Sequence, residues 1–448
     1  MMTRLLRLLG LLVIGAAFIV SDVNAEGARQ QTLFTNVHVF DGVNADRIEN
    51  ASVLVVGNLI KIVSTDPFKA EGATHIDGGG RTLMPGMIDG HAHLGIALPP
   101  PVHANNHWAY SGAAMVVEAE KMLMRGFTTV RDAGGPVYGL AKAIDEGMIP
   151  GPRIYPSGHF IGQTSGHGDF RGYNDAPLRD RDYRSFFERE WSFIADGKAD
   201  VRAYAREALR LGATQLKLMA GGGASSPWDP LDTTQYSVEE MRAAVEAAED
   251  WGTYVMVHVY HDRAVMRALE AGVKSIDHGA MIENDETMIA IKEAGAIFNP
   301  QTFIFSPPEE LVAVGDPAAY AKGAPLREGL GRSMELAKKH GVKIAFGVDI
   351  FGSPEMHAFQ NRELVHRLPW FTPAEILKQA TSNTAELIAM SGPRNPYQDG
   401  PLGVIQEGAY ADILLVDGNP LENIEVLTDP ANNIDLIMKN GVVFKNQL

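Results

Sequence analysis

The sequence of 448 residues predicts an α/β protein: a (β/α)8 TIM barrel with a small β-sandwich domain built from both chain ends. From residue 86 onward, short apolar segments alternate with helical patterns, as in a parallel sheet. The segments near both termini instead carry hairpin signals, such as the Asn-Gly pair at 440–441. No Gly-rich phosphate loop follows the first barrel strand, which disfavours the alternative of a doubly wound open sheet.

Eight segments have the composition of buried parallel strands. Helical patterns separate most of them, and those at 238–252 and 262–273 each have a glycine at the end, which is typical of a helix C-terminus. We expect the barrel at 86–385 and a discontinuous sandwich at 26–85 and 386–448. The expected barrel strands are 86–94, 128–134, 153–158, 215–220, 254–260, 275–279, 296–301 and 343–349.

Residues 1–25 have the pattern of a secretory signal peptide. Arg4 and Arg7 precede an apolar run that ends at Val20, and Ala25 closes a short segment that suits a signal peptidase. The apolar run is short for a membrane span, so an uncleaved anchor is the less favoured alternative. We expect an exported, periplasmic protein that has no membrane contact after cleavage.

The composition excludes several kinds of chemistry. The absence of cysteine excludes disulfides, thiolate metal ligands and cysteine nucleophiles. The 39 basic and 55 acidic residues give a net charge of -16, which argues against nucleic acid or an anionic membrane as a partner. The expected partner is a small molecule.

Polar side chains lie at the ends of several expected strands. His91 and His93 are two residues apart, so in a strand both imidazoles point to one face and can bind one metal ion. A pair of solvated or buried imidazoles is the alternative. Barrel active sites lie at the C-terminal strand ends, and so many unpaired polar groups would be costly to bury there without a shared purpose. The pattern predicts a metal site that also includes Lys217, His258, His278 and Asp349.

The segments that carry these residues resemble the amidohydrolase superfamily, and the resemblance extends through the whole mature chain. They are PGMIDGHAHLG, QLKLMAGGG, VHVY, SIDHG and FGVD. The loop QTSGHGD, together with the strand LKLMAGGGASSP, is similar to the prolidase-like, imidazolonepropionase-related subgroup of metal-dependent dipeptidases, which includes ochratoxin-degrading amidohydrolases.

The resemblance implies a centre of two divalent ions, usually Zn²⁺, and a homo-oligomer. His91, His93 and Asp349 would bind the more buried ion, and His258 and His278 would bind the other. Lys217 would be carboxylated by CO2, and its carbamate would bridge both ions. The alternatives for Lys217 are an extended surface-seeking amine or an ion pair with Asp349.

The chemistry that follows is amide hydrolysis by a metal-activated hydroxide. Asp349 would take the proton of the attacking hydroxide and pass it to the departing amine. His167 is the expected donor to the carbonyl oxygen, and a structural hydrogen bond to Asp169 is the alternative. Tyr260 would contact the carbonyl group or a substrate carboxylate, or pack against the barrel rim. The run 221–223 would let the backbone pass close to the metals, rather than form a phosphate loop.

The expected substrates are dipeptides, Xaa-Pro or other Xaa-Xaa, and N-acyl amino acids, including ochratoxin-like amides. Another reaction of the superfamily is the alternative: imidazolone ring opening, deamination, or lactone or phosphotriester hydrolysis. A scaffold without catalysis is a third possibility, which the complete ligand set disfavours.

Overall fold

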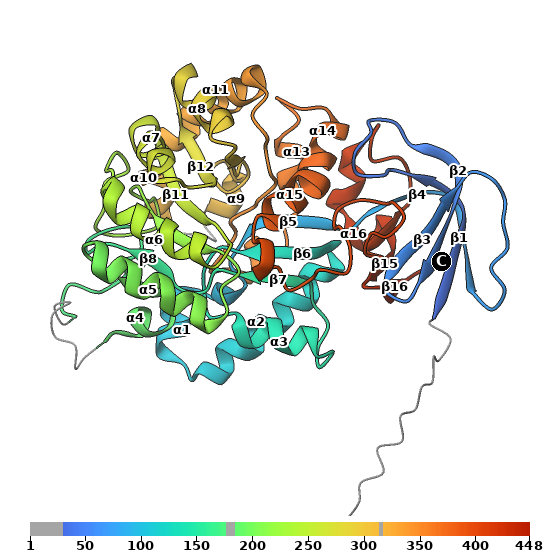
Figure 1. Cartoon of the computed structure of the whole chain (residues 1–448), viewed down its shortest axis with the longest axis horizontal. Helices are drawn as coiled ribbons and strands as arrows, with labels where there is room; N and C mark the ends of the chain where they lie inside the picture. Colours follow the sequence, from blue (N-terminus) through green and yellow to red (C-terminus); the bar gives the residue numbers. More distant parts are fainter. Residues whose placement is uncertain (1–29, 176–183, 313–316) are drawn as a thin grey trace, which may run out of the picture.

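The structure is a computed structural model that describes residues 30–175, 184–312 and 317–448. A β-sheet packs beside a larger part in which helices surround parallel strands (Figure 1). The expected signal peptide lies outside the described residues and stays a prediction. Across the described ranges, we find no helix that is both long and apolar enough to span a membrane.

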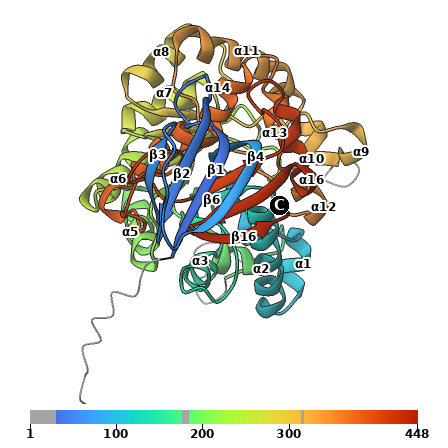
Figure 2. The same ribbon diagram turned by 90° about the vertical axis from the view of Figure 1, so that its right-hand side faces the viewer.

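Both chain ends contribute to one seven-stranded sheet, whose strand order is β16-β15-β14-β4-β1-β2-β3. Figure 2 shows this sheet facing the viewer, with the first strands in blue and the last in red. The strands are β1 (Gln31–Val39), β2 (Ile48–Val56), β3 (Leu59–Ser64), β4 (Thr74–Pro85), β14 (Ile413–Val416), β15 (Ile434–Lys439) and β16 (Val442–Asn446).

The two hairpins that the sequence predicts are confirmed, as β2 with β3 and β15 with β16, but the sheet differs from an antiparallel sandwich in two details. The hydrogen-bonded strands form one continuous sheet, and β1 pairs with β4 in parallel. The reason is the length of β4, whose second half pairs with β1 on one side and with β14 on the other. Three glycines at 78–80 form a bulge in β4 opposite Asn36, and a Cβ atom at Gly78 would lie 2.3 Å from Val37.

The larger part contains two parallel sheets. The first has the order β5-β6-β7, and the second has the order β13-β12-β11-β10-β8-β9. Apolar residues fill these strands, which are buried on both faces. The strands are β5 (Met87–Ala92), β6 (Phe127–Asp132), β7 (Arg153–Pro156), β8 (Phe160–Gly162), β9 (Ser192–Ile194), β10 (Leu216–Met219), β11 (Val255–His261), β12 (Ser275–Met281) and β13 (Ile297–Asn299).

The segment 343–349 is not the regular strand that the sequence predicts. It forms one isolated bridge, between Ile344 and Phe298. Its backbone N–H groups alternate between carbonyl oxygens and side-chain acceptors: Phe346 N donates to Thr384 at 2.8 Å, and Val348 N donates to Asp89 at 3.2 Å. These side-chain acceptors replace carbonyl groups of a neighbouring strand, so a continuous ladder does not form.

Backbone hydrogen bonds nevertheless connect the two parallel sheets on both sides. Thr214 N donates to Pro156 O at 2.8 Å, between the segments of β7 and β10. On the other side, Asp349 N donates to His91 O at 2.8 Å, and Ala345 N donates to Phe298 O at 2.8 Å. The segment 343–349 therefore lies between β13 and β5.

Helices follow most of the strands. Helix α6 begins with a capping box of Ser237 and Glu240, and α7 ends at Gly272, whose φ of 99° is left-handed, as the glycine pattern predicts. The helices are α1 (Pro100–Asn105), α2 (Trp108–Met124), α3 (Tyr138–Asp145), α4 (Phe186–Glu190), α5 (Lys198–Leu211), α6 (Val238–Asp250), α7 (Asp262–Ala271), α8 (Asp285–Glu293), α9 (Glu309–Val312), α10 (Pro317–Lys322), α11 (Ala324–His340), α12 (Pro354–His357), α13 (Arg362–His366), α14 (Pro373–Lys378), α15 (Thr384–Ala389) and α16 (Pro430–Asn433).

A buried ion pair joins the seven-stranded sheet to the larger part. The guanidinium of Arg153, in β7, contacts the carboxylate of Asp412 and also donates to Asn440 at 2.9 Å. Gly86 N donates to Asp412 O at 2.9 Å, directly before β5 begins. The first parallel strand is thus anchored to the sheet on its N-terminal side, which leaves its C-terminal end for the site described next.

Candidate metal centre

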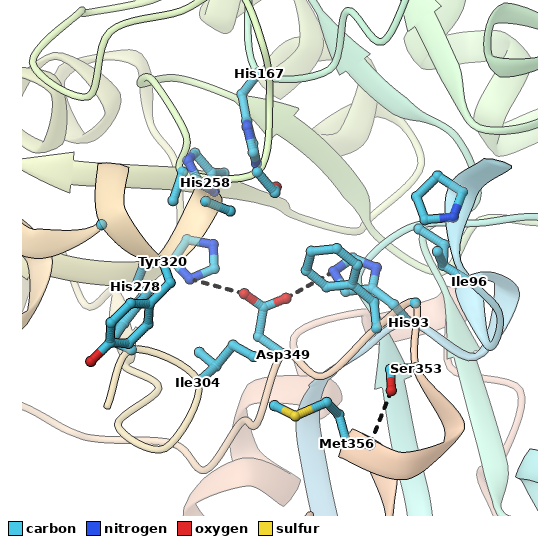
Figure 3. A pocket seen from close by; sticks show the side chains of 18 of the residues that line it. His93, Ile96, His167, His258, His278, Ile304, Tyr320, Asp349, Ser353 and Met356 are labelled. Carbon is cyan, nitrogen blue, oxygen red and sulfur yellow. Dashed lines mark hydrogen bonds and ion pairs between the residues drawn. The ribbon is translucent and has the colours of Figure 1, made fainter. Parts of the chain in front are cut away.

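The six predicted metal ligands surround one cavity of about 560 Å³. They come from β5 and the residue that follows it, from β10, β11 and β12, and from the segment 343–349. Figure 3 shows Asp349 between His93 and His278, with His258 above His278. The lining includes His91, His93, Lys217, His258, His278 and Asp349.

Three of these residues form a compact cluster of ligand atoms. One ligand atom each of His91, His93 and Asp349 lies within 4.8 Å of the others, and all three side chains are buried. Asp349 Oδ1 is 3.1 Å from His93 Nε2 and 3.4 Å from His91 Nε2. Such a set of two imidazoles and one carboxylate suits Zn²⁺.

Hydrogen bonds fix the rings of the first pair of histidines. His91 Nδ1 lies 2.6 Å from Asp277 Oδ2, and His93 Nδ1 lies 2.9 Å from the carbonyl oxygen of Gly134. Because both acceptors take the hydrogen on Nδ1, each ring keeps its lone pair on Nε2, which faces Asp349. A ligating histidine needs this arrangement.

The second pair is fixed in the same way, but through different nitrogens. His258 Nε2 lies 3.0 Å from the carbonyl oxygen of Gly222, and His278 Nδ1 lies 2.6 Å from Gln301 Oε1. The lone pairs are therefore on His258 Nδ1 and His278 Nε2. The two ring centroids are 4.5 Å apart, and the ring of His278 also lies 4.8 Å from that of His91. The second pair thus lies beside the first cluster.

The protonation of the rings agrees with a ligand role. Burial holds the pKa of His91, His258 and His278 well below the ordinary value, so these rings are neutral. For His93, burial acts in the same direction, but the hydrogen bond and charge of Asp349 raise the pKa. A cation in the site would compete with that proton.

The backbone is unusual at two of these positions. Asp349 has a φ of 61° and His278 a φ of 73°, in the left-handed region that non-glycine residues rarely adopt. Such conformations cost about 1–3 kcal/mol each and persist where the surrounding structure imposes them, as at binding sites. The Asp349 carboxylate and the His278 imidazole thereby point into the cavity.

Lys217 is 1% exposed, and within the described ranges its amine makes no hydrogen bond or ion pair. Burial lowers its pKa to about 8, against the attraction of Asp277 and Asp349. The amine therefore neither extends to the surface nor forms an ion pair with Asp349, which were the two expected alternatives. A buried amine with a lowered pKa is partly neutral, which is the form that reacts with CO2.

A network of buried polar side chains around Asp277 holds the ligand His91. Asp277 Oδ2 accepts from His91 and also from Arg131 at 2.8 Å and Asn299 at 3.2 Å, and its Oδ1 accepts from Ser275 at 2.5 Å. Asp277 was not among the residues predicted from the sequence. The available signal was its place in SIDHG, directly before the predicted ligand His278.

His167 lies at the upper edge of the cavity, where its ring stacks on that of His258 with centroids 3.9 Å apart (Figure 3). Its Nδ1 lies 2.7 Å from Ser226 Oγ. The expected alternative partner, Asp169, instead accepts hydrogen bonds from Ser165 and Arg171. Burial lowers the pKa of His167 to about 3, so the ring is neutral and carries one hydrogen. Donation to a carbonyl oxygen would require that hydrogen on Nε2, and this role stays a prediction.

Tyr260 lines the cavity next to His258, with ring centroids 4.7 Å apart. Its ring also contacts Phe305 at 5.9 Å, and burial raises the pKa of its hydroxyl. The side chain is therefore a neutral donor within the site rather than a residue of the outer rim.

The run of glycines after β10 brings the backbone next to the ligands, as the sequence predicts. Gly222 O accepts from His258, and a Cβ atom at Gly222 would lie 1.9 Å from the carbonyl oxygen of Pro230. A Cβ atom at Gly223 would lie 1.8 Å from His167 Nδ1. Only glycine permits these approaches.

Aromatic side chains cover one side of the cavity. The rings of Phe160 and Phe351 both lie 5.8 Å from the ring of His93, and Phe170 and Trp191 extend the same surface. We call these four residues the aromatic wall. A further cation, Arg327, also lines the cavity. The site thus combines an apolar surface with a small number of polar groups, as is typical of small-molecule sites.

Comparisons with known proteins identify the family. Residues 82–444 match the model of the amidohydrolase family. The ochratoxinase of Aspergillus niger is 31% identical over 424 residues, which cover 90% of this chain and 84% of that protein.

Solved structures agree. A prolidase in complex with N-methylphosphonate-L-proline is 36% identical, with a TM-score of 0.86 over 93% of this chain and all of that chain. A Xaa-Pro dipeptidase with bound methionine is 28% identical, with a TM-score of 0.80 over 93% of this chain and all of that chain. The A. niger ochratoxinase has a TM-score of 0.78 at 28% identity, over 93% of this chain and 96% of that chain. The chain therefore belongs to the amidohydrolase family, as a hydrolase of its prolidase-like and ochratoxinase subgroup.

Proposed function

We propose that this protein is a binuclear metal-dependent hydrolase that cleaves the amide bond of dipeptides or N-acyl amino acids. The observation that carries the proposal is the set of four histidines around Asp349, each with one ring nitrogen held by a protein acceptor and the other left for a ligand. The family match and the similarity to a prolidase and a Xaa-Pro dipeptidase support amide hydrolysis as the reaction.

The residues fit two divalent cations, for which Zn²⁺ is our proposal. His91 Nε2, His93 Nε2 and Asp349 would hold one ion. His258 Nδ1 and His278 Nε2 would hold the other. Imidazole nitrogens and carboxylate oxygens are ligands that Zn²⁺ prefers. The orphaned amine of Lys217 fits a carbamate that bridges the two.

We also propose that the two parallel sheets close into the (β/α)8 barrel. The hydrogen bonds of Thr214 to Pro156, and of the segment 343–349 to β13 and β5, support this closure. The barrel would occupy 86–385, with the discontinuous β-domain at 26–85 and 386–448. The cavity would then lie at the C-terminal strand ends, where barrel enzymes have their active sites.

The chain's own groups can perform the proton transfers of hydrolysis. Bound cations would polarise the amide carbonyl and lower the pKa of water in the site. Asp349 would take a proton from the attacking water, whose oxygen forms a bond to the carbonyl carbon. The same residue would deliver that proton to the nitrogen as the C–N bond breaks. His167 and Tyr260 line the cavity, and their imidazole and hydroxyl groups would orient the reacting group.

The preferred substrate, in this proposal, has a free carboxylate on the residue that supplies the amine and an apolar acyl side. Xaa-Pro dipeptides, other Xaa-Xaa dipeptides and ochratoxin-like amides share this chemistry. The aromatic wall beside His93 suits an apolar group, and Arg327 and Tyr260 are the cavity residues suited to a carboxylate. A charge-assisted hydrogen bond of this kind contributes about 1.5–3 kcal/mol.

The test is a screen of the Zn²⁺-loaded protein against a library of dipeptides and N-acyl amino acids, with release of free amino acids as the readout. Cleavage of several members, and its loss after chelation, is the expected result. Hydrolysis of imidazolones, lactones or phosphotriesters without any amide cleavage would refute the proposal.

A further inference from the structure

A chain of buried hydrogen bonds reaches His167 from outside the site. The Nδ1 atom of His167 contacts Ser226 Oγ at 2.7 Å, and the hydroxyl of Ser226 contacts the carboxylate oxygen Oδ1 of Asp229. The side chains of Ser226 and Asp229 are buried, and neither lines the cavity. Their side chains therefore do not contact a substrate directly, and the hydrogen bond to His167 connects them to the site.

The direction of these bonds follows from the donors around Asp229. Its Oδ2 accepts from Gly223 N at 2.8 Å and from Gln235 Nε2 at 3.1 Å. The ammonium of Lys322 lies 3.9 Å from Oδ1, which disfavours a proton there. A carboxylate only accepts, so the Ser226 hydroxyl donates to Asp229 and accepts from Nδ1–H of His167. Nε2 is then the ring nitrogen left for the cavity, and its lone pair makes it a hydrogen-bond acceptor there rather than the expected donor to a carbonyl oxygen.

The backbone around this chain is held as firmly as the side chains. Gln235 Oε1 accepts from His167 N at 3.0 Å, while its amide nitrogen donates to Asp229. One glutamine thus links the loop of His167 to the loop of Asp229. The missing side chain of Gly223 gives the imidazole its space, because a Cβ atom there would overlap the ring.

On the basis of the proposed function, we propose that Ser226 and Asp229 are positioning residues for amide hydrolysis, which hold the His167 ring so that Nε2 faces the reacting group of the substrate. Burial alone would not fix the ring, since a half turn about χ2 exchanges Nδ1 with Cδ2 and Nε2 with Cε1 and would move Nε2 away from its position. The hydrogen bond from Nδ1 to Ser226 removes that freedom. Nε2, the one proton-accepting position of the ring, stays available to the cavity.

A double-mutant cycle tests the proposal, with kcat and KM measured on one cleaved substrate of the screen. Ser226→Ala and Asp229→Asn should each lower kcat about ten- to a hundredfold, with KM and metal content nearly unchanged. In the His167→Ala background, the same two substitutions should lower kcat by less than about twofold, because they act through the ring that this variant lacks. Asp232→Asn, an exposed carboxylate of the same loop, is the control and should match the wild type.

Ser226→Thr is a second test. It retains the hydroxyl and should therefore recover part of the kcat that Ser226→Ala loses. If Asp229→Asn unfolds, the two Ser226 variants are sufficient to test the proposal. In Ser226→Ala, Asp229 keeps its hydrogen bonds to Gly223 and Gln235, so the loop is retained. Losses that add in the His167→Ala background would overturn the positioning role and leave the proposed function standing. A wild-type protein without amidase activity would overturn both.

Discussion

The Nδ1 atom of His278 lies 2.6 Å from the Oε1 atom of Gln301, and both side chains are buried. Gln301→Met removes this acceptor and keeps a similar side-chain volume. We expect the affinity of the second metal position to fall about ten- to a hundredfold, because the partner that orients a ligating histidine is lost. Elemental analysis after dialysis against graded chelator should find one ion retained where the wild type retains two.

The exposed glutamine Gln398 provides the control, and Gln398→Met should keep the wild-type metal content. Equal loss of both ions from Gln301→Met would contradict the assignment of His258 and His278 to a separate position.

Asp349→Asn should keep the fold and lower kcat by about 10²- to 10⁴-fold, because an amide cannot take the proton of the attacking water. Circular dichroism and thermal unfolding establish that the fold is retained, and steady-state kinetics give the loss. A rate near that of the wild type would remove Asp349 from the proposed proton transfers.

Lys217→Ala should lose metal and activity, and small carboxylic acids should restore part of both by replacing the carbamate. A carbamate is lost in acid, so denaturing mass spectrometry does not detect it. Electron density from crystals grown with bicarbonate is the direct measurement. An unmodified Lys217 in a fully metallated, active crystal would contradict the bridging role.

Removal of metal should lower the thermal stability as well as the activity. Because the ligands come from five separate segments, the ions bind the folded chain only. Each ion at a hundred times its Kd should add about 2.7 kcal/mol to the free energy of unfolding. Differential scanning calorimetry of the chelated and reloaded protein measures this change, and elemental analysis should give about two ions per chain. Identical unfolding temperatures would contradict the binuclear site.

Replacing the terminal carboxylate of a dipeptide by a primary amide should lower kcat/KM about ten- to a hundredfold. Arg327 is suited to this carboxylate, since within the described ranges its guanidinium contacts only the ring and carbonyl group of Tyr320. Arg327→Met should therefore reduce the preference for the acid over the amide. Arg332→Met, on the same helix but paired with Asp285, should leave the preference unchanged. Equal rates for acid and amide in the wild type would remove the requirement for a carboxylate.

The sequence predicts the convergence of the candidate ligands because two simple rules determine it. Side chains at i and i+2 of a strand share a face, which brings His91 and His93 together. The ends of parallel strands meet at one edge, which adds Lys217, His258 and His278, and the structure places all of these around one cavity. The family resemblance is likewise confirmed by the match over residues 82–444.

The partners of these residues could not be predicted, because they depend on contacts between distant segments. Gln301, Ser226 and Asp229 have no spacing that distinguishes them from other buried polar residues. The short strands β8 and β9, of three residues each, lack a periodic pattern. The segment 343–349 has the composition of a strand, but side-chain acceptors from Asp89 and Thr384 interrupt its ladder.

The shared sheet has a consequence for how the chain folds. Strand β4 pairs with β14, so residues roughly 330 positions apart must meet before the sheet is complete. During synthesis, the first four strands exist long before their partners, with the edge of β4 open. A chain that cannot finish its sheet until its last residues appear would stay without its native fold throughout translation. That delay would suit export in an extended form, which is what the expected signal peptide predicts for this chain.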